Sequence, residues 1–175
     1  MGLPRPLARW SSAAPAAPGF FELRQTELQP NKGEDFGALL LGKSPLGKSP
    51  LGTWTTDIGE SAARVYHVYH WADYDERDER LAEFGELPDC RDIRSRWGLC
   101  VARDSSSIFA EATPTLAAVG LPGLLGYAAK KGFAPAGPTV YELRTYQLRL
   151  GYATVPTFLE LYKVGLKDKL AADQS

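Results

Sequence analysis

The sequence predicts an α+β protein in which helices cover one face of an antiparallel sheet. Two observations carry this prediction: strand patterns alternate with amphipathic helix patterns, and the first strand pattern returns near the C-terminus. Of the 175 residues, 44% are hydrophobic and 11% are aromatic. This is enough apolar material for a folded core and excludes a disordered chain.

The first half of the chain supplies three strand patterns and one short helix. Residues 20–28 are aromatic and β-compatible, and residues 33–41 predict a short helix. Residues 52–58 alternate in polarity as a half-buried strand does. Residues 64–71 (RVYHVYHW) give the strongest strand pattern because β-branched and aromatic side chains predominate there.

A longer helix is predicted next. Asp73 is its expected N-cap, and Glu76 completes a capping box. Residues 88–111 are less regular and predict a last short strand, at 98–102 or at 107–111. One face of the helix would carry Tyr74, Arg77, Leu81 and Phe84.

The chain contains an internal repeat. FFELRQTEL at residues 20–28 returns as VYELRTYQL at residues 140–148, with an aromatic residue, Glu-Leu-Arg and a later leucine in register. Apolar residues at helical spacing then predict a helix over 155–170 with Thr154 as its N-cap. We interpret this as a second copy that stops early. Its strand and its apolar helix face are expected to dock on the first copy or on a second chain.

The order strand, helix, strand, strand, helix, strand is that of a ferredoxin-like sandwich. The bare face of such a sheet commonly pairs with another sheet, so the fold class expected here is a dimeric α+β barrel with an incomplete second repeat. The predicted parts are an N-terminal arm at 1–19, a first domain at 20–111, a linker at 112–139 and the start of a second domain at 140–175.

The first 19 residues differ from the rest. They contain Arg5 and Arg9, and no acidic residue occurs before Glu22. This bias favours a mitochondrial presequence over the alternative of a disordered arm, although the four prolines oppose a helix.

Composition also excludes several classes. A formal net charge of −1 gives no electrostatic footprint for nucleic acid. No apolar run approaches the roughly 18 residues that a membrane-spanning helix needs. The two cysteines, Cys90 and Cys100, have no CxxC spacing, so neither a disulfide framework nor a zinc site is expected.

A phosphate-loop pattern, GxxxxGK[ST], occurs twice around the tandem KSPLG duplication, at 37–44 and at 42–49. A phosphate loop needs a strand before it and a helix after it. Neither is predicted here, because Pro45, Gly47 and Pro50 prevent a helix. We therefore interpret the segment as a loop, whose Ser-Pro pairs are weak candidates for phosphorylation.

Both repeat openings, together with LGTWTTDIG and RVYHVYHWADYDER, resemble the NIPSNAP family over residues 20–111 and 138–170. In that resemblance His67 takes the position of the family histidine, Tyr69 that of the following aromatic residue, and Arg77 that of an arginine early in the next helix. The resemblance implies a dimeric α+β barrel, mitochondrial in animal members. Those members are linked to vesicle traffic and to the display of damaged mitochondria to autophagy receptors, with no established catalysis.

The sequence departs from the family in two places. The KSPLG duplication stands where the first helix would continue, and the second copy lacks the Gly-x-Trp and Val-x-His half. A splice variant, a partial gene model and a short form of the protein would share these features.

Two groups of residues are candidates for a role beyond the core. His67, Tyr69 and Trp71 share one face of their strand, because side chains alternate with period two, while His70 points the other way. These three either line a cavity in the barrel, or His67 is a core or interface histidine. The core interpretation is favoured, because fold analogy alone does not locate a function.

The second group is the repeated Glu-x-Arg. Glu22 with Arg24, and Glu142 with Arg144, project from one face of each strand and predict structural ion pairs between strands or copies.

Two functional hypotheses follow. The first is a non-enzymatic mitochondrial scaffold or adaptor, located in the matrix or peripherally on a membrane, that acts through protein contacts and pairs as a homodimer. The alternative is a small-molecule-binding or oxidising barrel with a cavity at His67, Tyr69 and Trp71. We expect no bound cofactor, no metal ion and no nucleic acid partner.

Overall fold

The computed structural model describes residues 19–42, 46–59, 63–131 and 141–172. The predicted presequence, the Ser44-Pro45 pair and the end of the predicted linker therefore lie outside the described residues. Among the residues that are described, no helix is both long and apolar enough to cross a membrane.

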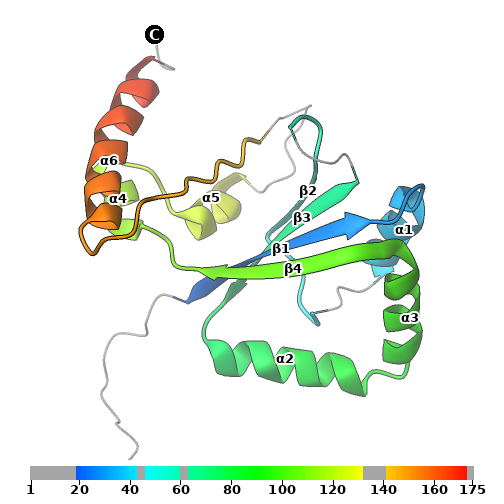
Figure 1. Cartoon of the computed structure of the whole chain (residues 1–175). Coiled ribbons are helices and arrows are strands. Elements are labelled where there is room, and N and C mark those ends of the chain that lie inside the picture. The colour runs from blue at the N-terminus through cyan, green and yellow to red at the C-terminus, as the bar shows by residue number, and fades with distance from the viewer. Residues whose placement is uncertain (1–18, 43–45, 60–62, 132–140, 173–175) are drawn as a thin grey trace, which may run out of the picture.

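The core of the fold is a four-stranded antiparallel sheet with strand order β2-β3-β1-β4 (Figure 1). The elements follow the predicted ferredoxin-like order with one additional helix before β4, so the predicted α+β class with an antiparallel sheet is confirmed. β1 lies inside the sheet and pairs with both β3 and β4. The strands are β1 (Phe20–Leu28), β2 (Gly52–Thr55), β3 (Arg64–Trp71) and β4 (Val101–Phe109).

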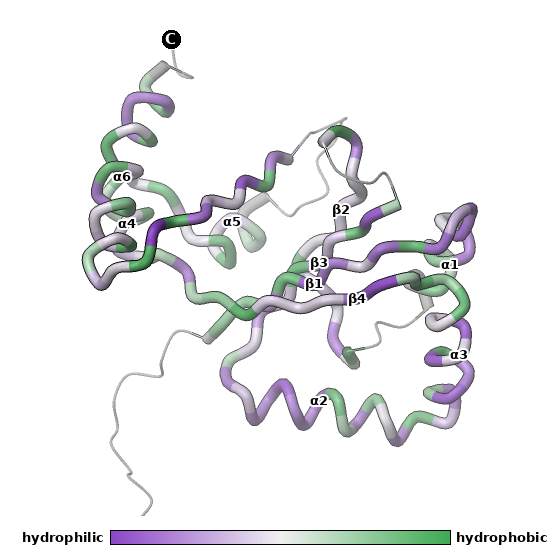
Figure 2. The backbone as a smooth tube through the Cα atoms, viewed as in Figure 1, coloured by the Kyte–Doolittle hydropathy of each residue, from purple (hydrophilic) through white to green (hydrophobic). Residues whose placement is uncertain are grey.

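Three helices, α1 (Gly33–Gly42), α2 (Tyr74–Glu86) and α3 (Cys90–Cys100), cover one face of the sheet (Figure 1). The predicted capping box starts α2: the Asp73 carboxylate accepts a hydrogen bond from the Glu76 amide, 2.7 Å away. The Glu76 carboxylate in turn accepts from the Ala72 amide, also at 2.7 Å. Figure 2 shows the hydrophilic character of α2, interrupted by the apolar residues that face the sheet.

The hydrophobic core lies between these helices and the sheet in three small clusters. Phe36 of α1 packs on strand residues, and Phe84 of α2 packs on α3. The third cluster, around Tyr69 and Trp71, is closed by Leu46 from the loop between α1 and β2. Because Leu46 belongs to the KSPLG duplication, this loop is part of the core and not only a surface connection.

The helix α3 was not predicted from the sequence. Residues 90–100 are helical, and the last strand, Val101–Phe109, overlaps the end of the expected strand at 98–102 and the start of the alternative at 107–111, so a last strand was predicted but neither set of bounds is correct. The helix buries only Cys90, Ile93 and Cys100 against the rest of the fold. So sparse an apolar stripe gives too weak a periodic signal to be read from the sequence. β2 is also shorter than the predicted 52–58.

The C-terminal helix was predicted but the strand before it was not observed, and Thr154, the expected N-cap, is the first residue of the helix. The predicted helix is confirmed as α6 (Thr154–Ala172), but residues 141–149 are extended without belonging to the sheet, so the predicted strand is wrong. A strand requires a hydrogen-bonded neighbour, and no described strand pairs with this segment.

The second copy docks on the rest of the chain only in part. The ring of Tyr141 lies 5.6 Å from that of Trp54 in β2, and α6 contacts α4. Two helices, α4 (Thr113–Ala118) and α5 (Leu124–Lys131), lie inside the region predicted as a linker.

Replacing Gly47, in the loop between α1 and β2, is predicted to destabilise the fold. Its φ is +67°, and a Cβ atom at this position would stand 2.6 Å from the carbonyl oxygen of Arg80. We expect Gly47→Ala to lower the free energy of unfolding in urea by roughly 1–3 kcal/mol. The control is Gly37→Ala in α1, where a Cβ meets nothing within 4 Å. That change is expected to stabilise by about 0.5–1 kcal/mol. Equal effects of the two changes would contradict the prediction.

Candidate functional site

The three candidate cavity residues of β3 lie on the face of the sheet that the helices cover. His67, Tyr69 and Trp71 are 0%, 1% and 0% exposed. Phe20 and Leu81 pack against the cluster that contains Tyr69 and Trp71. This placement corresponds to the core interpretation of His67, and the two described pockets are lined by other residues.

His67 is held as a neutral imidazole. Its Nδ1 atom lies 3.0 Å from the hydroxyl of Thr53 in β2, and its Nε2 atom has no hydrogen-bond partner among the described residues. Burial, together with the nearby positive charge of Arg24, lowers the pKa of His67 to about 4. A ring that stays uncharged can be accommodated among the aromatic side chains around it.

Glu22 of β1 is a buried polar side chain of the covered face with contacts to three other elements. Although it is only 1% exposed, its carboxylate accepts four hydrogen bonds. The indole of Trp71 donates at 3.0 Å, the hydroxyl of Ser106 at 2.6 Å, and the guanidinium of Arg77 at 2.8 and 3.2 Å. The site therefore joins β1, β3, β4 and α2 around a single charge.

The electrostatics of Glu22 follow from these contacts. Burial raises the pKa of Glu22, but the hydrogen bonds from Arg77, Ser106 and Trp71 outweigh it, so the pKa is lowered from 4.5. The folded state thus holds the carboxylate ionised more strongly than the unfolded chain does. The resulting stability is present above the unfolded pKa and is lost as the pH falls through the lowered one.

Arg24 takes a partner of its own. Its guanidinium forms a forked ion pair with Asp104 of β4, with Nε–O distances of 3.1 and 2.9 Å, and it lies 5.5 Å from the ring centre of Trp97. The hydroxyl of Thr26 also donates to Asp104. Glu22 and Arg24 therefore pair across the fold and not with each other.

In the second copy, Glu142 and Arg144 pair with each other at 2.6 Å. Their side chains are 61% and 57% exposed, so this pair is worth little to stability. The same Glu-x-Arg motif thus links β1 to other elements of the fold in the first copy, but forms a local, solvent-exposed ion pair in the second copy.

On each strand, the residues that alternate with those of the covered face point to the other side of the sheet, which we call the open face. At one end Phe21 stacks on Phe109, with ring centres 5.5 Å apart, and lies 5.2 Å from the ring of His70. The other end is polar. The described part of the chain contains no group of three or more His, Cys, Asp or Glu side chains that could hold a metal ion.

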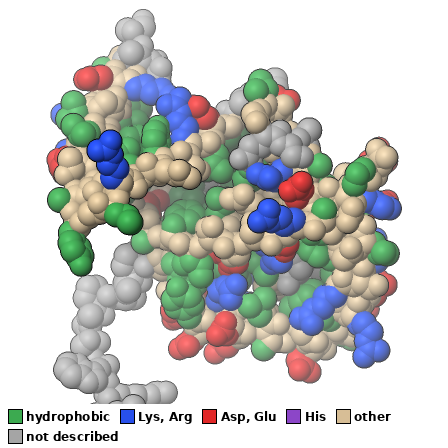
Figure 3. All heavy atoms as spheres, in the orientation of Figure 1, with side chains coloured by type: hydrophobic (Ala, Val, Ile, Leu, Met, Phe, Trp, Pro, Cys, Tyr) green, Lys and Arg blue, Asp and Glu red, His purple; other side chains and the backbone are tan. Residues whose placement is uncertain are grey.

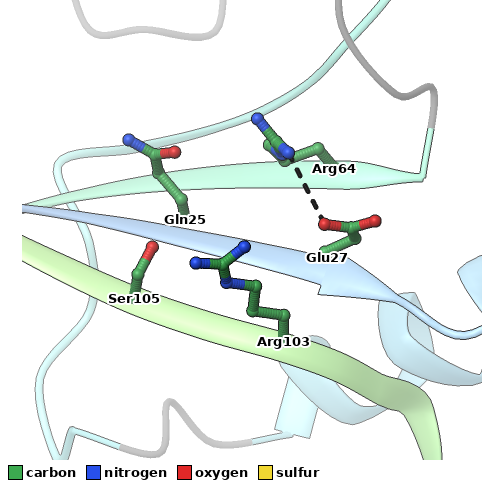
Figure 4. Close-up of a pocket in the computed structure, with 5 residues that line it drawn as sticks. All are labelled: Gln25, Glu27, Arg64, Arg103 and Ser105. Atoms are coloured by element: carbon green, nitrogen blue, oxygen red, sulfur yellow. Dashed lines mark hydrogen bonds and ion pairs between the residues drawn. The ribbon is translucent and has the colours of Figure 1, made fainter.

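The polar end contains a shallow pocket of about 180 Å³ (Figure 4). Glu27 stands opposite Arg64 of β3 and opposite Arg103 of β4 in the strand register. Gln25 and Ser105 form the next row. This pocket was not predicted from the sequence. The alternation of side chains along β1 could have placed Gln25 and Glu27 on the open face. The bounds of β4 were not predicted, so the position of Arg103 opposite Glu27 could not be inferred.

Arg77 is predicted to be required for burial of the Glu22 carboxylate. Arg77→Met leaves that charge without its ionic partner, and we expect a loss of about 3 kcal/mol or more in the free energy of unfolding. The matched control is Arg80→Met on the same helix, which breaks an exposed pair with Glu83 and should cost less than about 1 kcal/mol. In a double-mutant cycle, Glu22→Gln should recover part of the loss caused by Arg77→Met. Strict additivity of the two changes would contradict a coupled pair.

His67 is predicted to destabilise the fold at acid pH. Between pH 6.5 and about 4 the unfolded chain binds a proton at His67 that the folded chain does not, so stability falls as the pH is lowered through this window. The loss is at most about 3 kcal/mol. Urea unfolding at pH 7 and pH 5 should show a smaller difference for His67→Gln than for the wild type. An unchanged difference in this variant would exclude His67 as the titrating group.

Comparison with known proteins gives a family match. A family sequence model described as NIPSNAP matches residues 21–112, more than half of the chain. No curated protein matches the sequence.

Several solved structures are similar. A NIPSNAP family protein from Agrobacterium tumefaciens is 20% identical with a TM-score of 0.49, over 54% of this chain and 86% of that one. An uncharacterized NIPSNAP-like domain protein from Burkholderia xenovorans is 19% identical with a TM-score of 0.48, over 71% of this chain and 96% of that one. On the family match over residues 21–112, this chain belongs to the NIPSNAP family.

Proposed function

We propose that the chain is a non-enzymatic mitochondrial scaffold or adaptor that acts through protein contacts and forms a homodimer. The observation that carries the proposal is a C-terminal apolar surface, formed by Leu143, Tyr146, Leu148, Val155, Leu161 and Val164. The mitochondrial location rests on the arginine-containing, acid-free residues 1–19. A role in vesicle traffic or in mitophagy signalling rests on the family resemblance.

Within the C-terminal apolar surface, one aromatic contact joins the extended segment to α6. The ring of Tyr146 lies 5.2 Å from that of Phe158 in the helix, so the two segments touch at this point. Leu143 and Leu161 are 60% and 69% exposed. Figure 3 shows hydrophobic side chains gathered over this part of the molecule. Exposed apolar side chains gathered in one part of a molecule are typical of protein interaction sites.

A second copy of the chain is the partner that best suits this surface. Residues 141–149 repeat the sequence of β1, and β1 pairs with a strand on each side. The repeat segment pairs with no described strand, so its backbone groups and its leucines are available for addition to a sheet. Another copy supplies a sheet of the type that this sequence already pairs with.

The burial of His67 gives less support to the alternative function, a small-molecule-binding or oxidising barrel centred on this residue. The ring is enclosed by Phe36 and Tyr69, with centres 6.2 and 6.4 Å away. A small molecule could reach the ring only after the core had opened. We therefore keep the protein-contact hypothesis as the proposed function.

The homodimer is testable by size-exclusion light scattering over a range of protein concentrations. The wild type is expected to reach the mass of two chains, and Leu143→Asp is expected to weaken dimerisation about tenfold or more, because it places a charge in an apolar contact. The control is Leu99→Asp on α3, since Leu99 is 68% exposed but lies among the helices that cover the other face. A monomeric wild type, or equal losses in both variants, would overturn the proposal.

A further inference from the structure

The pocket at the polar end of the open face has an unbalanced charge. Glu27 lies in one row across three strands with Arg64 on one side and Arg103 on the other. The row therefore carries two positive charges and one negative charge. Directly opposite residues on neighbouring strands bring their Cβ atoms to about 4.5–5.5 Å, so all three side chains share one small region.

The two arginines are not equivalent. Arg64 contacts Glu27, with an N–O distance of 3.5 Å, as the dashed line in Figure 4 marks. Arg103 forms no ion pair with any residue that the structure describes, and it is exposed to solvent. Figure 4 shows its side chain leaning from β4 towards β1, over the floor of the pocket. The excess positive charge of the row is thus located at Arg103.

Neutral hydrogen-bonding groups complete the pocket. The amide of Gln25 and the hydroxyl of Ser105 stand in the adjacent row, beside Arg103. A guanidinium presents its N–H groups in a planar fork that matches the oxygens of a carboxylate or a phosphate. A hydroxyl and an amide can donate to the remaining oxygens.

We propose that this pocket binds the anionic group of a small molecule, a carboxylate or a phosphate, with Arg103 as the principal ligand and with Arg64, Gln25 and Ser105 in support. The volume of about 180 Å³ accommodates a small anion and not a large cofactor. This site lies on the opposite face of the sheet from His67, and the proposal does not depend on the homodimer.

Glu27 sets the affinity in this arrangement. Its carboxylate repels an incoming anion and also competes for Arg64. Replacing it by glutamine removes the repulsion while keeping the shape of the side chain. The site therefore makes a prediction of opposite sign for two neighbouring residues, weaker binding without Arg103 and tighter binding without the charge of Glu27.

The test is a titration of the full chain with malonate and, separately, with inorganic phosphate, followed by amide chemical shifts and by calorimetry at low salt. Saturable binding of either anion is expected, with shifts confined to the ends of β1, β3 and β4 that carry the pocket. Arg103→Ala should weaken binding about tenfold or more. Arg103→Lys, which keeps the charge but loses the fork, should weaken it less. Glu27→Gln should tighten binding several-fold, an effect that loss of folding cannot produce.

The matched control is Arg91→Ala on α3, which removes an exposed arginine from the helix-covered side and should leave binding unchanged. The ratio between the two titrations identifies the preferred anion. The absence of saturable binding of both anions would overturn the proposal. Equal weakening by Arg91→Ala and Arg103→Ala would also overturn it, because binding would then follow net charge and not the pocket.

Discussion

The buried carboxylate of Glu22 is the interaction on which the rest of the fold depends. A charge this deep in a protein is tolerated only when nearly all of its oxygen lone pairs are satisfied. Trp71, Ser106 and Arg77 satisfy them from β3, β4 and α2. Each of these elements is therefore fixed relative to β1 by hydrogen bonds as well as by apolar packing. The same need explains why an arginine stands early in α2, a helix in which most of the other charged residues are exposed.

The two faces of the sheet have different chemistry as a result. The covered face encloses Glu22 and the neutral His67, and its partly exposed Arg24–Asp104 pair joins β1 to β4. The open face leaves its charged groups in contact with solvent, where a ligand or a partner can reach them. The open face and the C-terminal apolar surface are therefore the places where a ligand or partner could bind. The buried contacts of Glu22 stabilise the fold.

Much of the fold could be predicted because strong local patterns coincide with the tertiary structure. β1 and β3 were predicted with the bounds that the structure has, since β1 opens with two aromatic residues and β-branched and aromatic residues dominate β3. The Asp73 cap was predictable because it is a contact within one helical turn. The partners of Glu22 and Arg24 could not be predicted, because Arg77 and Asp104 are 55 and 80 residues away from them along the chain. The pocket was missed for the same reason, since its residues come from three strands.

The repeat of the β1 sequence near the C-terminus shows which features the sequence determines and which depend on the tertiary structure. By itself the sequence determined the family, the bounds of β1 and β3 and the alternation of side chains along them, since these are set by local sequence patterns. Residues 141–149 share this alternation and yet remain outside the sheet. Only the tertiary structure decided which copy becomes a strand, because a strand exists through hydrogen bonds to a neighbour and its own sequence does not supply that neighbour. It also decided which face of the sheet is buried, because a period of two makes both faces possible and the packing of helices selects one.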